Sequence, residues 1–322
     1  MSNKRLKILI TDCDHPSVEI EKEILSEIDS ELLLAHCNTE NEVIKVAQDA
    51  DGIINQYAPI TRRVIDSLKK CKVIVRYGVG VDNIDIEAAT EYGIIVANVP
   101  DFCIDEVSTH AMALILACAR GIILLDSKIK EKKWDFTLAK PLFRTHGKIL
   151  GLFGLGNIAR AVAKKASGFG LKIIAYDPYI SKADHEIELV KFSKLLSVSD
   201  FISIHAPLTI ETRHYFGENE LKKIKKTAYL INTARGPIID ERALYLALEE
   251  KWIAGAALDV MEEEPPDWKN SLLKLDNLII TPHISFYSEE SYVELKTKTA
   301  KTLLSVLKGE LPGAIVNPQV IK

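Results

Sequence analysis

Residues 149–159 have the sequence Ile-Leu-Gly-Leu-Phe-Gly-Leu-Gly-Asn-Ile-Ala, and this stretch decides the fold. It contains the pattern Gly-x-Gly-x-x-Ala at Gly154, Gly156 and Ala159, after an apolar run of strand type and before an amphipathic helical pattern. In such a strand–turn–helix unit, the first glycine permits the tight turn, the second lets the backbone approach a pyrophosphate, and the small third residue allows close packing of helix on strand. The stretch therefore predicts a dinucleotide-binding Rossmann unit.

Asp177 ends the next apolar run, 21 positions after Gly156 (177 − 156). A carboxylate at that place can accept hydrogen bonds from the ribose hydroxyls of an adenosine and would repel a 2′-phosphate. The predicted cofactor is therefore NAD rather than NADP. The alternative is a plain turn at Asp177-Pro178, because both residue types favour turns.

Apolar runs alternate with amphipathic stretches on both sides of this unit, which is typical of parallel sheets covered by helices. The predicted strands are 7–11, 52–55, 73–76, 94–97, 149–153, 172–176, 201–205, 228–232, 256–260 and 278–281. A helix over 104–125 is apolar on nearly every side, which predicts that it is buried all round. A last helix is expected over 289–307.

Composition narrows the class of protein. A chain of 322 residues with 47% hydrophobic and 27% charged residues suits two globular domains. A net charge of −4 gives no general attraction to nucleic acid or to an anionic membrane. Five cysteines without a Cys-x-x-Cys spacing argue against a disulfide framework or a metal site, and the apolar stretch Ala111–Ala119 is too short to span a bilayer. We expect a cytoplasmic protein without a metal.

Three polar residues stand where predicted strands end: Arg235 in INTARG, Glu264 in DVMEEEPP and His283 in ITPHI. Ligands of open α/β sheets bind outside the carboxyl ends of the strands. Arginine can hold a carboxylate with two hydrogen bonds, histidine can deliver a proton near neutral pH, and a carboxylate beside it fixes its tautomer. Singly, the three could be a surface ion pair, an acidic turn and a cap. Together they predict reduction of a carbonyl beside a carboxylate.

Six blocks in order along the chain resemble the D-isomer-specific 2-hydroxyacid dehydrogenases. They are Arg76–Asp85 (RYGVGVDNID), Gly151–Ala159, His205–Thr209 (HAPLT), Ile231–Gly236, Ala256–Pro266 and Thr281–His283. The resemblance is strongest to the branch that includes C-terminal binding protein and phosphoglycerate dehydrogenase. The segments Val99–His110, Trp134–Arg144 and His283–Ser291 are the basis of that likeness.

The resemblance implies a role for each site residue. Arg235 binds the substrate, Glu264 is the supporting acid and His283 is the proton donor. The cofactor-binding residues are Gly154, Gly156, Asn157, Ile158, Asp177, Ala206, Pro207, Thr233, Ala234 and Asp259, the last at the nicotinamide carboxamide, with a strand-end cap as its alternative. The substrate-binding residues are Arg76, Val79, Gly80 and Phe286. We also expect Tyr57, Phe102 and Phe136 near the substrate tail, with core packing as the alternative for the two phenylalanines.

The resemblance also implies the architecture: an α/β fold of two domains, in which a Rossmann NAD-binding domain is inserted into a flavodoxin-like substrate domain. We expect the substrate domain to comprise 1–100 and 290–322 and the NAD-binding domain 101–289. Members of the family are usually homodimers, with the helix near Ile104–Leu125 at the interface.

Two other functions are compatible with the same motifs. One is D-3-phosphoglycerate dehydrogenase of serine biosynthesis, although many such enzymes have a C-terminal regulatory domain that is not expected here. The other is an NADH-sensing binding protein of the corepressor type. Those relatives have extended tails, and we expect none in this chain. The expected partner is a small 2-keto or 2-hydroxy acid, with no nucleic acid and no membrane.

Overall fold

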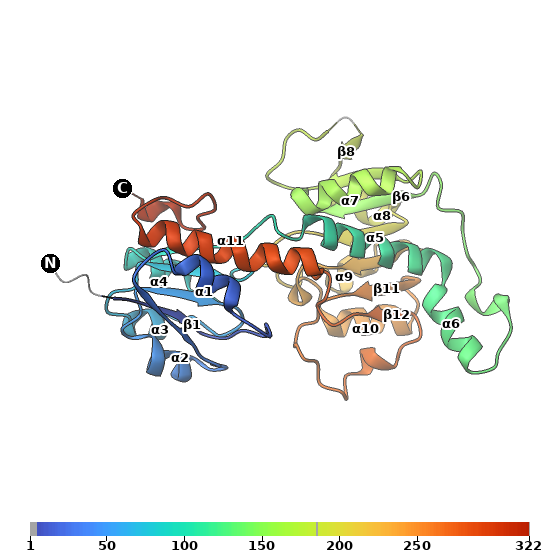
Figure 1. The fold of residues 1–322 in the computed structure, drawn as a ribbon. Helices are drawn as coiled ribbons and strands as arrows, with labels where there is room; N and C mark the ends of the chain where they lie inside the picture. Colours follow the sequence, from blue (N-terminus) through green and yellow to red (C-terminus); the bar gives the residue numbers. More distant parts are fainter. Residues whose placement is uncertain (1–4, 185, 322) are drawn as a thin grey trace. The chain divides into compact units, whose positions relative to one another are not determined.

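The computed structural model describes residues 5–184 and 186–321. The chain forms two compact units, each built on its own sheet (Figure 1). The first unit comprises Met1–Cys103 and Ser288–Lys322, and the second comprises Ile104–Tyr287.

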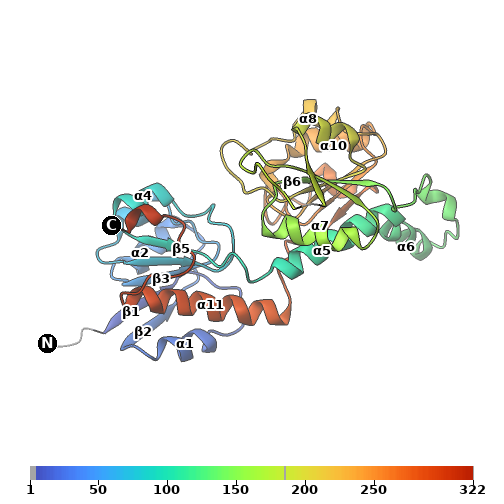
Figure 2. The same cartoon turned by 90° about the horizontal axis from the view of Figure 1, so that it is seen from above.

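The first unit has a five-stranded parallel sheet in the order β2-β1-β3-β4-β5, which is the flavodoxin-like order. Its strands are β1 (Leu6–Ile10), β2 (Ser30–Leu34), β3 (Gly52–Asn55), β4 (Val73–Arg76) and β5 (Ile95–Ala97). Its helices are α1 (Glu19–Leu25), α2 (Glu40–Ala47), α3 (Arg62–Ser67), α4 (Ile86–Glu91) and α11 (Glu289–Leu307). Helices α1 and α11 lie on one face of the sheet, and α2 and α4 lie on the other (Figure 2).

The second unit has a seven-stranded parallel sheet in the order β12-β11-β10-β9-β6-β7-β8. Its strands are β6 (Ile149–Phe153), β7 (Lys172–Tyr176), β8 (Ile187–Leu189), β9 (Phe201–Ile204), β10 (Tyr229–Asn232), β11 (Gly255–Leu258) and β12 (Leu278–Ile280). From β8 to β11 this is the 3-2-1-4-5-6 order of Rossmann folds, and β12 adds a strand at one edge.

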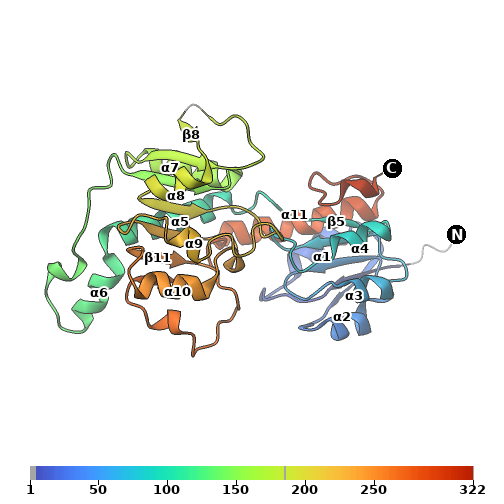
Figure 3. The same cartoon turned by 180° about the vertical axis from the view of Figure 1, so that it is seen from behind.

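Helices cover both faces of the second sheet (Figure 3). They are α5 (Ile104–Arg120), α6 (Ile122–Lys130), α7 (Asn157–Ser167), α8 (Phe192–Val198), α9 (Glu218–Leu221) and α10 (Glu241–Glu249), with short 3-10 helices at Phe136–Ala139, Gly236–Ile238 and Ser271–Lys274. Successive strand residues point to opposite faces. Thus Leu230 packs in the core under α8–α10, and Ile231 packs in the core under α5 and α7.

The predicted fold class is confirmed, and all ten predicted strands are present to within two residues at each end. Two strands escaped prediction, β2 and β8, and both lie at sheet edges. In β2 most residues are half-buried or exposed, and β8 has only three residues, so neither has the apolar run that marks a buried strand.

The predicted helix over 104–125, buried all round, is wrong in two respects. The helix ends at Arg120 because Gly121 adopts φ +59°, a left-handed conformation that cannot continue a right-handed helix. The following helix α6 has no buried residue, and Ile122 and Ile123 are each about half exposed. The apolar residues after Gly121 therefore face outward in this chain.

Among the residues that the structure describes, no single helix has both the length and the apolar composition to cross a membrane; α5 and α6 meet those criteria only as a pair, which bends by 63°.

Candidate active site

The glycine turn after β6 has the geometry that the sequence predicts. Gly154 has φ +89°, and a Cβ atom there would lie 2.8 Å from the backbone nitrogen of Ala206, so no other residue fits. Gly156 is the N-cap of α7, and a Cβ there would meet no atom within 4 Å. Gly156 and Asn157 are exposed and Ile158 is half-buried. The first turn of an 11-residue helix thus opens onto free space, which suits an anionic pyrophosphate.

Asp177 holds two backbone amides at the end of β7. Its carboxylate accepts hydrogen bonds from the amide of Leu155 in the glycine turn and from the amide of Tyr179, each at 2.9 Å. The hydrogen bond to Tyr179 forms the turn that the sequence offers as the alternative role of Asp177-Pro178. Asp177 therefore has a structural role in this turn. Each carboxylate oxygen can still accept a further hydrogen bond, which leaves capacity for a ribose hydroxyl.

The carboxyl end of β10 adds a buried polar group. Thr233 is only 7% exposed, and its hydroxyl has no hydrogen-bond partner within the described part of the chain. A buried polar group that lacks a hydrogen-bond partner destabilises a protein unless a ligand satisfies it. The Thr233 hydroxyl, at the carboxyl edge of the sheet, is therefore suited to contact a polar ligand. Next to it, Asn232 accepts from the amide of Ala234 and donates to the carbonyl oxygen of Arg235. Sequence reasoning missed Asn232, whose amide shapes this turn.

His283 and Glu264, which the sequence predicts to act together, lie in direct contact. Nδ1 of His283 lies 2.6 Å from Oε2 of Glu264, whose Oε1 accepts from the amide of Met261 at 2.9 Å. Because an ionised carboxylate only accepts hydrogen bonds, Nδ1 must carry a proton. The other ring nitrogen, Nε2, is left for a substrate oxygen.

The charge state of Glu264 suits this role. Burial alone would raise the pKa of the Glu264 carboxyl, but the hydrogen bond and charge of His283, the amide of Met261 and the nearby guanidinium of Arg235 together lower it below its ordinary value. The carboxylate therefore remains ionised at neutral and mildly acidic pH.

The loops after β10 and β11 are packed in direct contact. A Cβ on Gly236 would lie 2.0 Å from the carbonyl carbon and oxygen of Met261, so only glycine fits there. This contact sets Arg235 beside the turn that holds Glu264. Arg235 is half-buried, and its Nη1 donates to the carbonyl oxygen of Ala234 at 2.7 Å.

Asp259 fixes the loop that contains His283. Its side chain is buried and accepts from the hydroxyl of Thr281 at 2.6 Å and from the amides of Ile284 and Ser285 at 3.0 and 2.9 Å. His283 itself has φ +51°, and its amide donates to the carbonyl oxygen of Asp259 at 2.7 Å. These contacts are structural, as the strand-end cap predicted as the alternative for Asp259 requires.

The predicted substrate-binding residues of the first unit follow β4. Arg76 ends that strand, and its Nη1 would lie 1.7 Å from a Cβ on Gly78, which has φ +134°. The amides of Val79 and Gly80 donate to no acceptor in residues 5–184 and 186–321, while Asn98 holds the carbonyl oxygen of Val79 at 2.6 Å. The loop thus presents two available amide donors.

The four aromatic residues expected near the substrate tail lie in different surroundings. The Phe286 ring is 6.4 Å from the His283 ring, edge to face. Tyr57 follows β3 and is 54% exposed, whereas Phe102 is buried, as its core alternative predicts. Phe136 lies at the opposite end of the strands from His283. Its 3-10 helix packs against α6, and the residues after it line a cavity at the amino ends of the strands.

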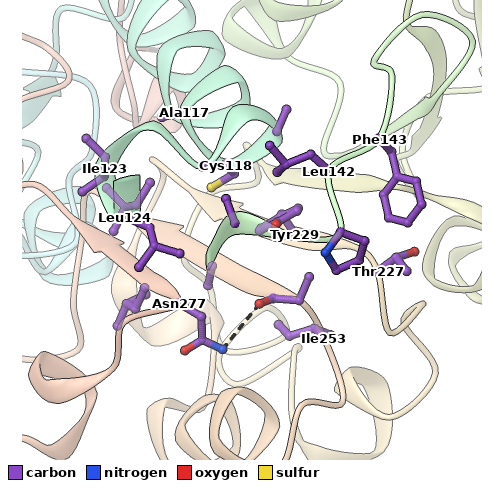
Figure 4. Close-up of a pocket in the computed structure, with 18 of the residues that line it drawn as sticks. Ala117, Cys118, Ile123, Leu124, Leu142, Phe143, Thr227, Tyr229, Ile253 and Asn277 are labelled. Atoms are coloured by element: carbon purple, nitrogen blue, oxygen red, sulfur yellow. Dashed lines mark hydrogen bonds between the residues drawn. The ribbon is translucent and has the colours of Figure 1, made fainter. Parts of the chain in front are cut away.

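That cavity has a volume of about 790 Å³ and is drawn in Figure 4. Its lining includes Cys118 and Leu124 from α5 and α6, Leu142, Tyr229 at the start of β10 and Asn277 just before β12. Since Arg235 and His283 follow the carboxyl ends of these strands, the cavity is at the opposite edge of the sheet and is not the catalytic site.

Comparisons with known proteins agree with this geometry. Residues 112–285 match the family model of the D-isomer specific 2-hydroxyacid dehydrogenase, NAD binding domain. A D-3-phosphoglycerate dehydrogenase of Methanocaldococcus jannaschii is 45% identical over 97% of this chain, and the chain spans 59% of that relative's length. A glyoxylate reductase of Korarchaeum cryptofilum is 39% identical, covering 87% of this chain and 86% of its own.

A solved structure is also similar. The D-lactate dehydrogenase of Aquifex aeolicus, complexed with NAD and lactic acid, has 28% identity and a TM-score of 0.86, with 96% of this chain and 99% of that chain covered.

Proposed function

This chain belongs to the D-isomer specific 2-hydroxyacid dehydrogenase family of NAD-dependent oxidoreductases, and we propose that it interconverts a small 2-keto acid and the corresponding D-2-hydroxy acid. The observation that supports this most directly is the 2.6 Å contact between His283 and Glu264 at the carboxyl edge of a Rossmann sheet. NAD supplies or accepts the hydride at C2 of the substrate. The first unit is the substrate domain and the second the NAD-binding domain in this proposal.

The substrate carboxylate is held by positive and amide groups. Arg235 binds it through its guanidinium, which also polarises the neighbouring C2 carbonyl. The free amides of Val79 and Gly80, with Arg76 beside them, complete its binding from the first unit. These contacts orient C2 for attack by hydride.

His283 moves the proton. In the reducing direction, Nε2 of the imidazolium gives its proton to the C2 oxygen as negative charge develops there, and the product is a hydroxyl group. Glu264 holds Nδ1 and stabilises the imidazolium before that transfer. In the oxidising direction the neutral ring takes the proton back.

The residues that we assign to NAD binding follow the carboxyl ends of strands in the second sheet. Gly154, Gly156, Asn157 and Ile158 would hold the pyrophosphate, and Asp177 would accept from the ribose. Four residues line the cleft, namely Ala206, Pro207, Thr233 and Ala234, and Asp259 meets the carboxamide of the nicotinamide. The open space over Gly156 and the unpartnered hydroxyl of Thr233 both fit this assignment.

The loops of the first unit favour an unphosphorylated substrate. The segments 11–18, 56–61 and 77–85, which follow β1, β3 and β4, contain no arginine or lysine, whereas Asp12, Asp14, Asp82 and Asp85 are acidic; Arg76 is the last residue of β4. A phosphate would need more positive charge than this. The second candidate is D-3-phosphoglycerate dehydrogenase, which the name of the Methanocaldococcus jannaschii relative favours.

We also propose a homodimer through the second unit. Helix α6 exposes Ile122 and Ile123, of which Ile123 lines the cavity of Figure 4, and the segment after α6 exposes Trp134 (92%) and Phe136 (74%). Large exposed apolar side chains next to an apolar cavity are typical of an interface. A second copy has both features, so a two-fold arrangement can bury each segment on the other copy.

The cofactor preference tests the assignment of Asp177. We expect wild-type protein to bind NADH more tightly than NADPH, and Asp177→Ala to reduce that ratio, since a lost hydrogen bond typically costs about 0.5–1.5 kcal/mol and repulsion of the 2′-phosphate disappears. The measurement is the ratio of the two dissociation constants by fluorescence titration, with Asp184→Ala as control. Equal affinities in the wild type would contradict the assignment.

The pH profile tests the acid–base pair. In reduction, the rate falls at high pH when the donor loses its proton. Without a carboxylate the imidazolium is less stable, so Glu264→Gln should shift this limb of the kcat profile to lower pH, whereas the exposed neighbour change Glu263→Gln should not. His283→Ala should slow reduction by about a hundredfold or more and leave NADH binding largely intact. An unmoved limb in Glu264→Gln would remove Glu264 from the mechanism.

A panel of 2-keto acids tests the substrate class. We expect NADH oxidation to be faster with glyoxylate, hydroxypyruvate or apolar 2-keto acids than with 3-phosphohydroxypyruvate. Phe286→Ala should lower kcat/KM more for bulky apolar substrates than for glyoxylate, at about 0.8 kcal/mol per methylene that loses its contact. Phe169→Ala, a matched change just before the amino end of β7 at a residue that is 47% exposed, is the control. A clear preference for the phosphorylated substrate would favour the second candidate instead.

Sedimentation velocity tests the dimer. Wild-type protein should sediment as a dimer at micromolar concentration, and Ile123→Asp combined with Trp134→Ser should shift it to monomer by placing polar groups in the apolar contact. Trp268→Ser, which alters another exposed tryptophan (81%), should not. A dimer that survives the double substitution would place the interface elsewhere.

A further inference from the structure

His110 lies on α5 between Thr109 and Ala111, and the proposed mechanism does not use it. Its side chain is 22% exposed, and its Nε2 lies 3.0 Å from the hydroxyl oxygen of Thr281. That hydroxyl is in turn 2.6 Å from Oδ1 of Asp259. A chain of three side chains therefore joins α5 to the ends of β12 and β11.

The direction of each hydrogen bond in this chain is fixed by chemistry. The carboxylate of Asp259 can only accept, so Thr281 uses its one hydroxyl hydrogen toward Asp259. The Thr281 oxygen must then accept from His110, and Nε2 of His110 must carry a hydrogen. This holds for the neutral and for the charged ring, so the contact does not depend on the titration of His110.

The chain ends on the loop that contains the proposed proton donor. Oδ1 of Asp259 receives both Thr281 and the amide of Ile284, and Oδ2 receives the amide of Ser285. The residue before these two amides, His283, has a left-handed backbone at φ +51°, a conformation that residues other than glycine rarely adopt. Such a conformation persists when surrounding contacts impose it, and the Asp259 carboxylate supplies those contacts.

We propose that His110 is a positioning residue for the proton donor: by donating to Thr281, it fixes the threonine hydroxyl on Asp259, and Asp259 thereby holds the loop of His283. The inference rests on the proposed role of His283, and all of its residues lie in the second unit. Its chemical requirement is a hydrogen-bond donor at the place of Nε2, which also lies 3.7 Å from Oδ1 of Asp259.

The test compares substitutions that keep or remove each donor. His110→Gln and Thr281→Ser keep a donor near the original place, whereas His110→Leu and Thr281→Val remove it. The removing variants should lower kcat for 2-keto acid reduction about tenfold or more, because small misplacements of a catalytic group are costly. The dissociation constant of NADH should change less than twofold, and the conservative variants should restore most of kcat.

A double variant checks that the residues act as one chain. His110→Leu with Thr281→Val should be no slower than the slower single variant, since both remove the same support for Asp259. Multiplied losses, or an unchanged kcat in His110→Leu, would overturn the inference.

A second readout does not need activity. Hydrogen exchange of the amides of Ile284 and Ser285, followed by mass spectrometry or NMR, should become faster in both removing variants and remain as in wild type in His110→Gln and Thr281→Ser. Unchanged exchange in His110→Leu would overturn the inference whatever the activity. A wild type that binds NADH yet reduces no 2-keto acid would instead contradict the proposed function alone.

Discussion

Parallel pairing in register sets the site of the second unit. Asn232 pairs with Leu258, and Leu258 pairs with Ile280, so the next residues along the three strands, Thr233, Asp259 and Thr281, stand at one level of the sheet edge. Thr233, Asp259 and Thr281 are the first residues after their strands, and the loops that they begin contain Arg235, Glu264 and His283, respectively. A shift of one residue in either pairing would turn these side chains to the other face and separate the group. The chemistry thus depends on the same hydrogen bonds that hold the sheet together.

Above that edge, polar groups rather than apolar packing fix the turns. Asp259 and Asn232 are buried; Asn232 bonds backbone groups of its own turn, whereas Asp259 accepts from backbone amides of the loop after β12. A buried carboxylate is stable only when its oxygens are well hydrogen-bonded, and two amides and a hydroxyl do this for Asp259. The absence of a side chain at Gly236 then allows two of the turns to touch. Precise placement of the acid–base pair follows from these satisfied polar contacts.

The features that sequence reasoning could predict are those with a local signal. Strand runs, the glycine turn and the order of Arg235, Glu264 and His283 at strand ends are visible in the chain itself. The missed features depend on residues that are distant in the sequence or on how helices pack. His110 contacts Thr281, which is 171 positions away, and the surroundings of Phe136 depend on the packing of its 3-10 helix against α6. The break at Gly121 had a local signal, a glycine inside an apolar helix pattern, but the all-round apolarity of the segment outweighed it. The exposure of α6 could not be predicted from the sequence, because an exposed apolar surface and a buried core have the same amino-acid composition.

Relatives with different substrate names share one chemical task. A glyoxylate reductase and a D-3-phosphoglycerate dehydrogenase both match this chain over most of its length, and both names describe a hydride exchanged at a carbon beside a carboxylate. That task needs a carboxylate anchor, a proton donor and a nicotinamide site, which our proposal assigns largely to the second unit. What differs between such substrates is the group beyond C2. In our proposal the loops after β1, β3 and β4 discriminate between such groups. A change of substrate class can therefore come from a few loop residues without disturbing the hydrogen bonds that position His283, and the charge of those loops is the property that separates a phosphorylated tail from an apolar one.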